Sequence, residues 1–194
     1  MKNKTDSRFL FIDTETGGTI PTKHSLLSIG MVVWDASLGE MARKEIFIKY
    51  PRYFVTKEAQ RINKFDRNNQ NNIGVEPKIA VNELMYFIKN NFPEDFYVTI
   101  IGHNVHFDID FLKVLFKKCG RSFEKYFSHR YIDTYSVFKT LVLAGVLDRD
   151  LNSSADAFKY FNIDVEKRHD ALDDCIATVE LYEKMMHLIS NNYC

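Results

Sequence analysis

The feature that most constrains the fold is an apolar run, Phe9 to Ile12, which leads directly into Asp13 and Glu15. Consecutive apolar residues of this kind predict a central strand that is buried on both faces. Side chains alternate along a strand, so both carboxylates should project from one face, ~7 Å apart. Like charges at the end of a buried strand repel each other unless a cation compensates them. The segment therefore predicts either a cation site or a strand end whose acidic side chains simply reach solvent.

Composition sets the outer limits of the interpretation. The chain has 194 residues, which suits one domain over 1–194 with its core over about 8–189. Its formal net charge is zero, so it lacks the global basic field of a non-specific nucleic-acid binder. The three cysteines form no C-x-x-C pair, the N-terminus is polar, and no stretch approaches about 20 apolar residues. We therefore expect a cytoplasmic protein with reduced thiols and no membrane partner.

Apolar periodicity and turn residues predict the order of the elements. Strands are expected over residues 9–12, 26–34, 46–50, 97–101 and 131–132. Helices are expected over residues 56–67, 77–90, 134–144, 153–161 and 170–189, with another directly after Gly102-His103-Asn104 and a polar loop over 68–72. The first three strands are joined by short links, which favours an antiparallel meander, and helices then alternate with strands. This order indicates an α/β domain built on a mixed sheet.

Two further carboxylates lie where helices begin. Asp108 heads the buried stripe of the helix after Asn104, whereas Asp110 falls nearer its wet side. Asp174 lies in the first turns of the last helix, for which Asp170 and Asp173 read as the N-cap and capping-box residues. His169 precedes Asp174 by five residues, and five residues advance a helix by ~500°, so we expect His169 to stand apart from the carboxylates.

These groups suit metal-assisted phosphoryl chemistry. Carboxylate oxygens without thiolates or clustered imidazoles favour hard cations such as Mg²⁺ or Mn²⁺. Two such ions can clamp an in-line phosphoryl displacement. A histidine is suited to removing a proton from the attacking water at neutral pH.

Three segments resemble the motifs of the DEDDh exonuclease family, whose members include proofreading subunits, ribonuclease T and oligoribonuclease. They are Asp13-Thr14-Glu15 on a strand, Asn104-x-x-Phe107-Asp108 opening a helix, and His169-x-Ala171-x-x-Asp174 opening the last helix. The resemblance runs in the same order from about Phe9 to Met186, nearly the whole chain. It implies a ribonuclease H-like mixed five-stranded sheet flanked by helices.

The resemblance also implies a function and a set of roles. The function is a 3′→5′ exonuclease that uses two Mg²⁺ or Mn²⁺ ions to release nucleoside 5′-monophosphates from the 3′ end of single-stranded nucleic acid, with DNA favoured. In the implied site Asp13 bridges both ions, Glu15 and Asp174 complete the first, Asp108 acts on the second through water, and His169 is the general base. The implied substrate contacts come from Thr16, Gly17, Ile20, Asn104 and Phe107.

Two positions depart from the family's pattern. Many relatives carry Thr-Gly-Leu after the first motif, with the Leu wedged against the terminal base, whereas Gly17-Gly18-Thr19-Ile20 stands here. We expect Ile20 to take that role. Ser28 stands where relatives often carry Glu in the second strand, and nothing in the sequence explains that exchange.

Several alternatives stay open at this point. An exoribonuclease acting on RNA or short oligoribonucleotides would use the same residues, because discrimination depends on 2′-hydroxyl contacts. A non-catalytic nucleic-acid- or polymerase-binding module could share the fold. His103 and His106 superficially suggest a zinc site, and Asn104 could simply cap its helix. The resemblance is compatible with a free-standing nuclease, with a homodimer, and with a DNA polymerase subunit.

Overall fold

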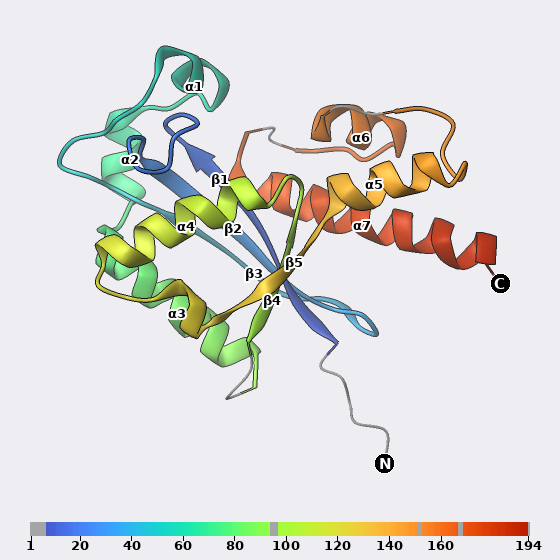
Figure 1. Cartoon of the computed structure of the whole chain (residues 1–194). Helices are drawn as coiled ribbons and strands as arrows, with labels where there is room; N and C mark the ends of the chain where they lie inside the picture. The colour runs from blue at the N-terminus through green and yellow to red at the C-terminus, as the bar shows by residue number, and fades with distance from the viewer. Residues whose placement is uncertain (1–6, 94–96, 151–152, 167–168, 194) are drawn as a thin grey trace.

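A five-stranded sheet lies between two groups of helices in the computed structural model (Figure 1), which describes residues 7–93, 97–150, 153–166 and 169–193. The strand order is β3-β2-β1-β4-β5. The strands are β1 (Arg8–Thr16), β2 (Leu26–Asp35), β3 (Gly39–Phe47), β4 (Val98–Gly102) and β5 (Phe127–Asp133). The β1–β2 and β2–β3 pairs are antiparallel, while the β1–β4 and β4–β5 pairs are parallel. The predicted meander and mixed five-stranded sheet are thus confirmed.

Helices cover both faces of the sheet. They are α1 (Lys57–Ile62), α2 (Arg67–Ile73), α3 (Pro77–Asn91), α4 (His106–Lys118), η1 (Phe123–Lys125), α5 (Thr134–Leu143), α6 (Ser154–Tyr160) and α7 (Ala171–Tyr193). Helices α3 and α4 pack on one face, and α5, α6 and α7 lie over the other (Figure 1). Leu10 and Ile12 of β1 belong to the first core, and Phe11 belongs to the second. Strand β1 is therefore buried on both faces, as its sequence predicts.

Some parts of the prediction remain untested. Residues 1–6, whose polarity contributed to the expected cytoplasmic location, and the Lys167–Arg168 pair lie outside the described residues. None of the helices in the described ranges combines the length and apolar character needed to cross a bilayer. The cytoplasmic location stays a prediction.

The segment after β3 differs from its prediction. A single helix over 56–67 and a loop over 68–72 are both wrong, because the chain forms two short helices, α1 and α2. Lys64 takes a left-handed backbone with φ 51°, which ends the first helix, and the Asp66 side chain accepts from the Asn69 N–H to start the second. Gln70 is buried, and its amide donates to the carbonyls of Leu27 and Ile48 at 2.7 and 3.0 Å. These bonds hold the polar helix against the edge of the sheet.

The sequence prediction displaces the third strand and makes the fifth strand too short. The third strand runs over Gly39–Phe47 rather than 46–50, and the fifth runs over Phe127–Asp133 rather than 131–132. Both are edge strands with many exposed polar side chains, which hide the apolar alternation. The predicted Asp133 cap is confirmed, because its carboxylate accepts from the Tyr135 N–H at 2.9 Å.

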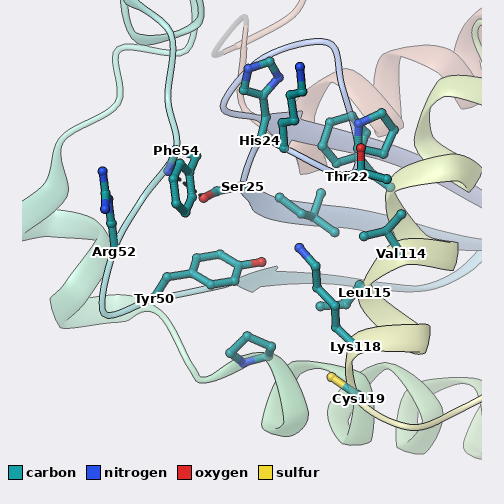
Figure 2. Close-up of a pocket in the computed structure, with 15 residues that line it drawn as sticks. Thr22, His24, Ser25, Tyr50, Arg52, Phe54, Val114, Leu115, Lys118 and Cys119 are labelled. Atoms are coloured by element: carbon teal, nitrogen blue, oxygen red, sulfur yellow. Dashed lines mark hydrogen bonds between the residues drawn. The ribbon is translucent and has the colours of Figure 1, made fainter.

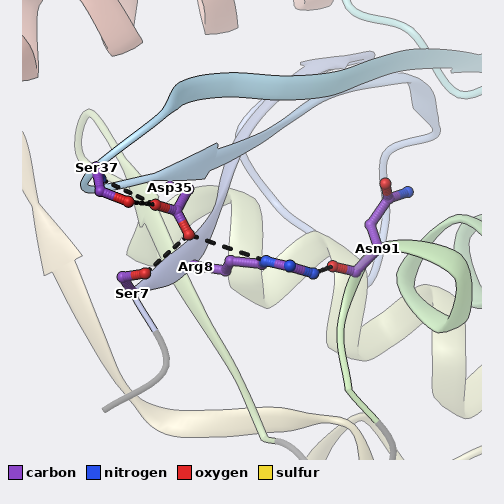
Figure 3. Close-up of polar contacts among 5 residues, drawn as sticks. All are labelled: Ser7, Arg8, Asp35, Ser37 and Asn91. Atoms are coloured by element: carbon purple, nitrogen blue, oxygen red, sulfur yellow. Dashed lines mark hydrogen bonds and ion pairs between the residues drawn. The ribbon is translucent and has the colours of Figure 1, made fainter. Parts of the chain in front are cut away.

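A polar cluster fastens the start of β1 to the turn after β2 (Figure 3). Asp35 accepts from the Ser37 N–H and hydroxyl at 2.9 and 2.6 Å and from the Ser7 hydroxyl at 2.8 Å. The Arg8 guanidinium lies 3.9 Å from the same carboxylate and donates to the Asn91 carbonyl at 2.7 Å. The bonds from Ser37, followed by the bond from Ser7, lower the pKa of Asp35 from 3.8 to about 2.

We expect Asp35→Asn to lower the melting temperature at pH 7, because an amide cannot accept all of these bonds as a carboxylate does. A depressed folded-state pKa stabilises the fold above about pH 4, and this stabilisation is lost as the pH falls toward 2. The difference in melting temperature between the parent and Asp35→Asn should therefore become smaller as the pH falls. Thermal melts from about pH 2 to 7 measure it, with the exposed Asp164→Asn as control. A gap that widens toward low pH would contradict this account.

Candidate active site

The carboxyl end of β1 presents acidic side chains on one face and a hydroxyl on the other. Phe11 packs in the core beneath α7, so Asp13 and Glu15 follow it onto that face of the sheet. Thr14 follows Ile12 onto the opposite face, beneath α4. In the register with β2, Asp13 lies opposite Gly30 and Glu15 lies opposite Ser28. Ser28 is buried there, and its small side chain is the feature that departs from the family's pattern.

Asp108 reaches the strand end from α4. The Thr14 hydroxyl donates to the Asp108 carboxylate at 2.6 Å, and both residues are buried. Burial raises the pKa of Asp108 to about 7, although the bond from Thr14 opposes the shift. A nearby cation would favour the ionised form of such a carboxylate. Asp110 is half-buried and contacts His106 and Lys113 at 3.4 and 3.9 Å, so it faces away from the site as predicted.

Asp174 and His169 come from the start of α7. The Asp170 side chain accepts from the Asp173 N–H at 3.3 Å, which confirms Asp170 as a cap, and the capping-box role of Asp173 stays a prediction. His169 lies outside the helix with φ 66°, and its N–H donates to the Asp174 carboxylate at 3.2 Å. Ligand atoms of Glu15, His169 and Asp174 all lie within 4.8 Å of one another. The expectation that His169 stands apart is wrong, because it assumed helical backbone at His169.

This arrangement fits a divalent cation. Two carboxylates and an imidazole lie close enough to share one ion, and the carboxylate oxygens among them are the ligands that hard cations such as Mg²⁺ or Mn²⁺ prefer. A cavity of about 480 Å³ opens over them. Its lining includes all of the predicted catalytic residues and three of the predicted substrate contacts: Asp13, Glu15, Asp108, His169, Asp174, Thr16, Asn104 and Phe107.

Two predicted substrate contacts lie outside this lining. The Gly17 N–H donates to the Ser25 carbonyl at 2.7 Å, and its carbonyl accepts from the Thr56 N–H at 2.8 Å. A Cβ at Gly17 would lie 2.2 Å from the Phe54 carbonyl oxygen, so glycine here makes room for the protein's own backbone. Ile20 is 41% exposed and does not line the cavity. Direct contact of either residue with substrate stays a prediction.

The residues around Asn104 argue against zinc and against a simple cap. His103 Nδ1 lies 3.0 Å from the Thr134 hydroxyl, while His106 pairs with Asp110 at the start of α4. Neither histidine joins the group of converging ligands found among the described residues. The N-cap of α4 is Val105 without a side-chain bond, so the capping role considered for Asn104 is wrong. Asn104 is exposed with φ 56° and lines the cavity.

Three supporting residues were missed by the sequence analysis. Thr14 orients Asp108, and the Asn63 amide donates to the Thr16 carbonyl at 2.8 Å. Gly30 lets the start of α7 rest on β2, because a Cβ there would lie 2.1 Å from the Ala171 carbonyl oxygen. The signal for Gly30 was present in the sequence, since a glycine within an apolar strand often marks the close approach of another backbone.

We expect Gly30→Ala to lower kcat by roughly 10²-fold or more, because an added methyl group must move the first turn of α7, and misplacing catalytic groups by ~1 Å costs about that much. Its melting temperature should also fall. Gly39→Ala is the matched control. Its backbone φ of 76° strains an alanine and so lowers stability, but the added Cβ would have no neighbouring atom closer than 4.0 Å and so would displace nothing. Single-turnover nuclease assays and thermal melts measure both. Equal activity of the two variants at matched folding would show that Gly30 does not position the site.

Comparisons with known proteins agree with this geometry. The family model described as Exonuclease (RNase_T) matches residues 10–182. No curated protein matches the sequence. Among solved structures, E. coli exonuclease I in complex with a dT13 oligonucleotide superposes with a TM-score of 0.81 at 18% identity, covering 96% of this chain and 42% of that one. Cell-death related nuclease 4 (CRN-4) gives 0.76 at 13%, covering 94% and 64%. The chain thus spans less than two thirds of these relatives, and their likeness shows a shared fold.

Proposed function

The chain belongs to the exonuclease family, and from this premise we propose that it is a metal-dependent 3′→5′ exonuclease that releases nucleoside 5′-monophosphates from single-stranded nucleic acid. The observation that carries the proposal is the convergence of Glu15, His169 and Asp174 within 4.8 Å, in a cavity that Asp13 and Asp108 also line. A non-catalytic module would have little reason to keep such a cluster, because acidic side chains gathered without compensation destabilise a fold.

The acidic residues supply the proposed metal positions. Glu15 and Asp174 would hold one Mg²⁺ or Mn²⁺ ion, Asp13 would bridge to a second, and Asp108 would act on the second through water. Such ions supply a Lewis acid for the phosphoryl oxygens and lower the pKa of bound water. Thr14 keeps Asp108 oriented toward the cavity by its 2.6 Å bond. The hydrogen bond from the His169 N–H to the Asp174 carboxylate likewise keeps Asp174 oriented toward the cavity.

His169 is the proposed general base. It is exposed at the cavity rim, where a neutral imidazole can accept a proton from water and pass it to solvent. Its distance from Glu15 and Asp174 also fits an imidazole ligand of the first ion. The two roles differ in whether removing the ring weakens metal binding.

Single-stranded DNA is the favoured substrate, because a solved structure with this fold holds a dT13 oligonucleotide. Phe107 offers an aromatic side chain and Asn104 an amide in the cavity wall, which suits a terminal base. RNA remains the alternative substrate, since its 2′-hydroxyl could be accepted by the same wall. A single domain over 1–194, a homodimer and a polymerase subunit stay predictions.

The first test of the function combines metal, substrate end and one variant. Chelation should abolish cleavage, and a 3′-phosphate should block the release of mononucleotides from a labelled single strand. Mg²⁺ or Mn²⁺ should raise the melting temperature, because a ligand at 100 times its Kd stabilises the folded state by about 2.7 kcal/mol. Asp13→Asn should lose roughly 10²-fold or more in rate and most of the metal-induced shift, since each ion supplies several kcal/mol of charge stabilisation.

Asp110→Asn is the control, because Asp110 lies near Asp108 on the same helix but does not line the cavity. It should keep both the rate and the metal shift. Full activity in chelator, internal cleavage of a circular strand, or an unchanged Asp13→Asn rate would each overturn the proposal. Parallel digestion of single-stranded DNA, single-stranded RNA and duplex decides the substrate class.

We expect His169→Ala to lower kcat by about 10²–10⁴-fold, as removal of a positioned base does. If His169 is the base, the metal-induced melting shift should stay as in the parent, whereas a ligand role would reduce it. His106→Ala is the control, being exposed and paired with Asp110. A His169→Ala rate within about threefold of the parent would exclude the base role.

A further inference from the structure

A second cavity, of about 770 Å³, is shown in Figure 2. Its walls are the loop before β2, the segment 50–54 after β3, and one side of α4. It is larger than the catalytic cavity of about 480 Å³ and shares no lining residue with it. The roles proposed above leave this cavity without a function.

The charge of the second cavity has a single sign. Three cationic side chains line it: Lys23, Arg52 and Lys118. No aspartate or glutamate belongs to its lining in the part of the chain that the structure describes. The whole chain balances 26 basic against 26 acidic residues, so this concentration is local. A wall with only positive charge attracts anions such as phosphodiesters.

Aromatic rings stand among these cations. Phe54 is 50% exposed, and the Arg52 guanidinium lies over its ring at 5.0 Å from the centroid. Figure 2 shows the Tyr50 hydroxyl and the Lys118 amino group pointing toward the middle of the cavity. Exposed aromatic faces next to basic groups are the arrangement with which proteins bind single strands, since bases stack on the rings while cations meet the phosphates.

The two cavities are separated by thin walls. Phe107 lines the catalytic cavity and Phe111 lines the second, and their ring centroids are 5.0 Å apart. Gly18 lines the catalytic cavity and His24 belongs to the lining of the second, and a Cβ at Gly18 would lie 2.6 Å from the His24 ring. Residues that line the two cavities are therefore in contact with each other, so the cavities are neighbours.

We propose that the second cavity binds upstream nucleotides of the single strand whose 3′ end lies in the catalytic cavity, with Arg52 and Lys118 at its phosphates and Phe54 against a base. This inference rests on the proposed exonuclease function and names the extent of the substrate that the protein holds. It also explains how a chain of zero net charge can bind a polyanion, because the phosphates would contact only one basic surface.

The test measures affinity against strand length. Binding of 5′-labelled oligothymidylates of two, four and eight nucleotides is followed by fluorescence anisotropy in chelator, for the full chain and for Arg52→Ala/Lys118→Ala. The parent should bind the octanucleotide more tightly than the dinucleotide, and the double variant should lose most of that gain. Two lost phosphate contacts should also lower the slope of log affinity against log salt by about 1.4, at about 0.7 per contact. Phe54→Ala should weaken octanucleotide binding roughly tenfold without changing the slope.

The control is Lys117→Ala/Lys159→Ala, which removes the same charge from exposed positions that line neither cavity. It should bind as the parent does. Equal losses in the two double variants, or no gain of affinity with length in the parent, would overturn the proposal. Mononucleotide release with Mg²⁺ is scored separately, so failure of the exonuclease function is distinguishable from failure of this inference.

Discussion

The repulsion among carboxylates at the end of β1 is the constraint on which the rest of the structure depends. Asp13 and Glu15 come from the sheet, Asp108 from α4 on one face and Asp174 from α7 on the other. No local segment could hold these charges together, because each would turn toward water if it were free to do so. Apolar burial on both faces of β1 supplies the rigidity, with Leu10 and Phe11 fully buried on opposite sides.

Helix α7 transmits the rigidity of the sheet to Asp174, because the helix is anchored on the sheet at two points. Its first turn rests on Gly30, and about 11 residues later Tyr182 packs edge-on against Phe11 and Trp34, each at 5.6 Å between centroids. At 1.5 Å per residue these two anchors lie ~16 Å apart along the helix. The Trp34 indole N–H also donates to Glu183 at 2.7 Å. A helix fastened at two separated points cannot tilt freely, so Asp174 is held in place by contacts far from the chemistry as well as by near ones.

The positions of the site carboxylates could be predicted from the sequence, and the same physical reason explains which residues could not. Each carboxylate lies at the end of an element, where apolar periodicity stops, and periodicity is the strongest signal a single sequence carries. His169 was misplaced because its position depends on one left-handed residue, φ 66°, which periodicity does not report. Gln70 was assigned to a loop because its burial depends on carbonyls of Leu27 and Ile48, which are distant in sequence. The role of Gly30 depends on the start of α7, which is distant in sequence from the strand that carries the glycine.

The loop that follows β1 contributes residues to both cavities. Residues on one side of that loop line an acidic cavity that suits cations, and residues on its other side line a basic cavity that suits phosphates. A Cβ at Gly17 would meet the Phe54 backbone and a Cβ at Gly18 would meet the His24 ring, so both glycines allow close packing of this loop. Larger side chains at these two positions would push the walls apart. On the proposed function, a positive surface this close to an acidic site would lower the repulsion that a polyanion meets there.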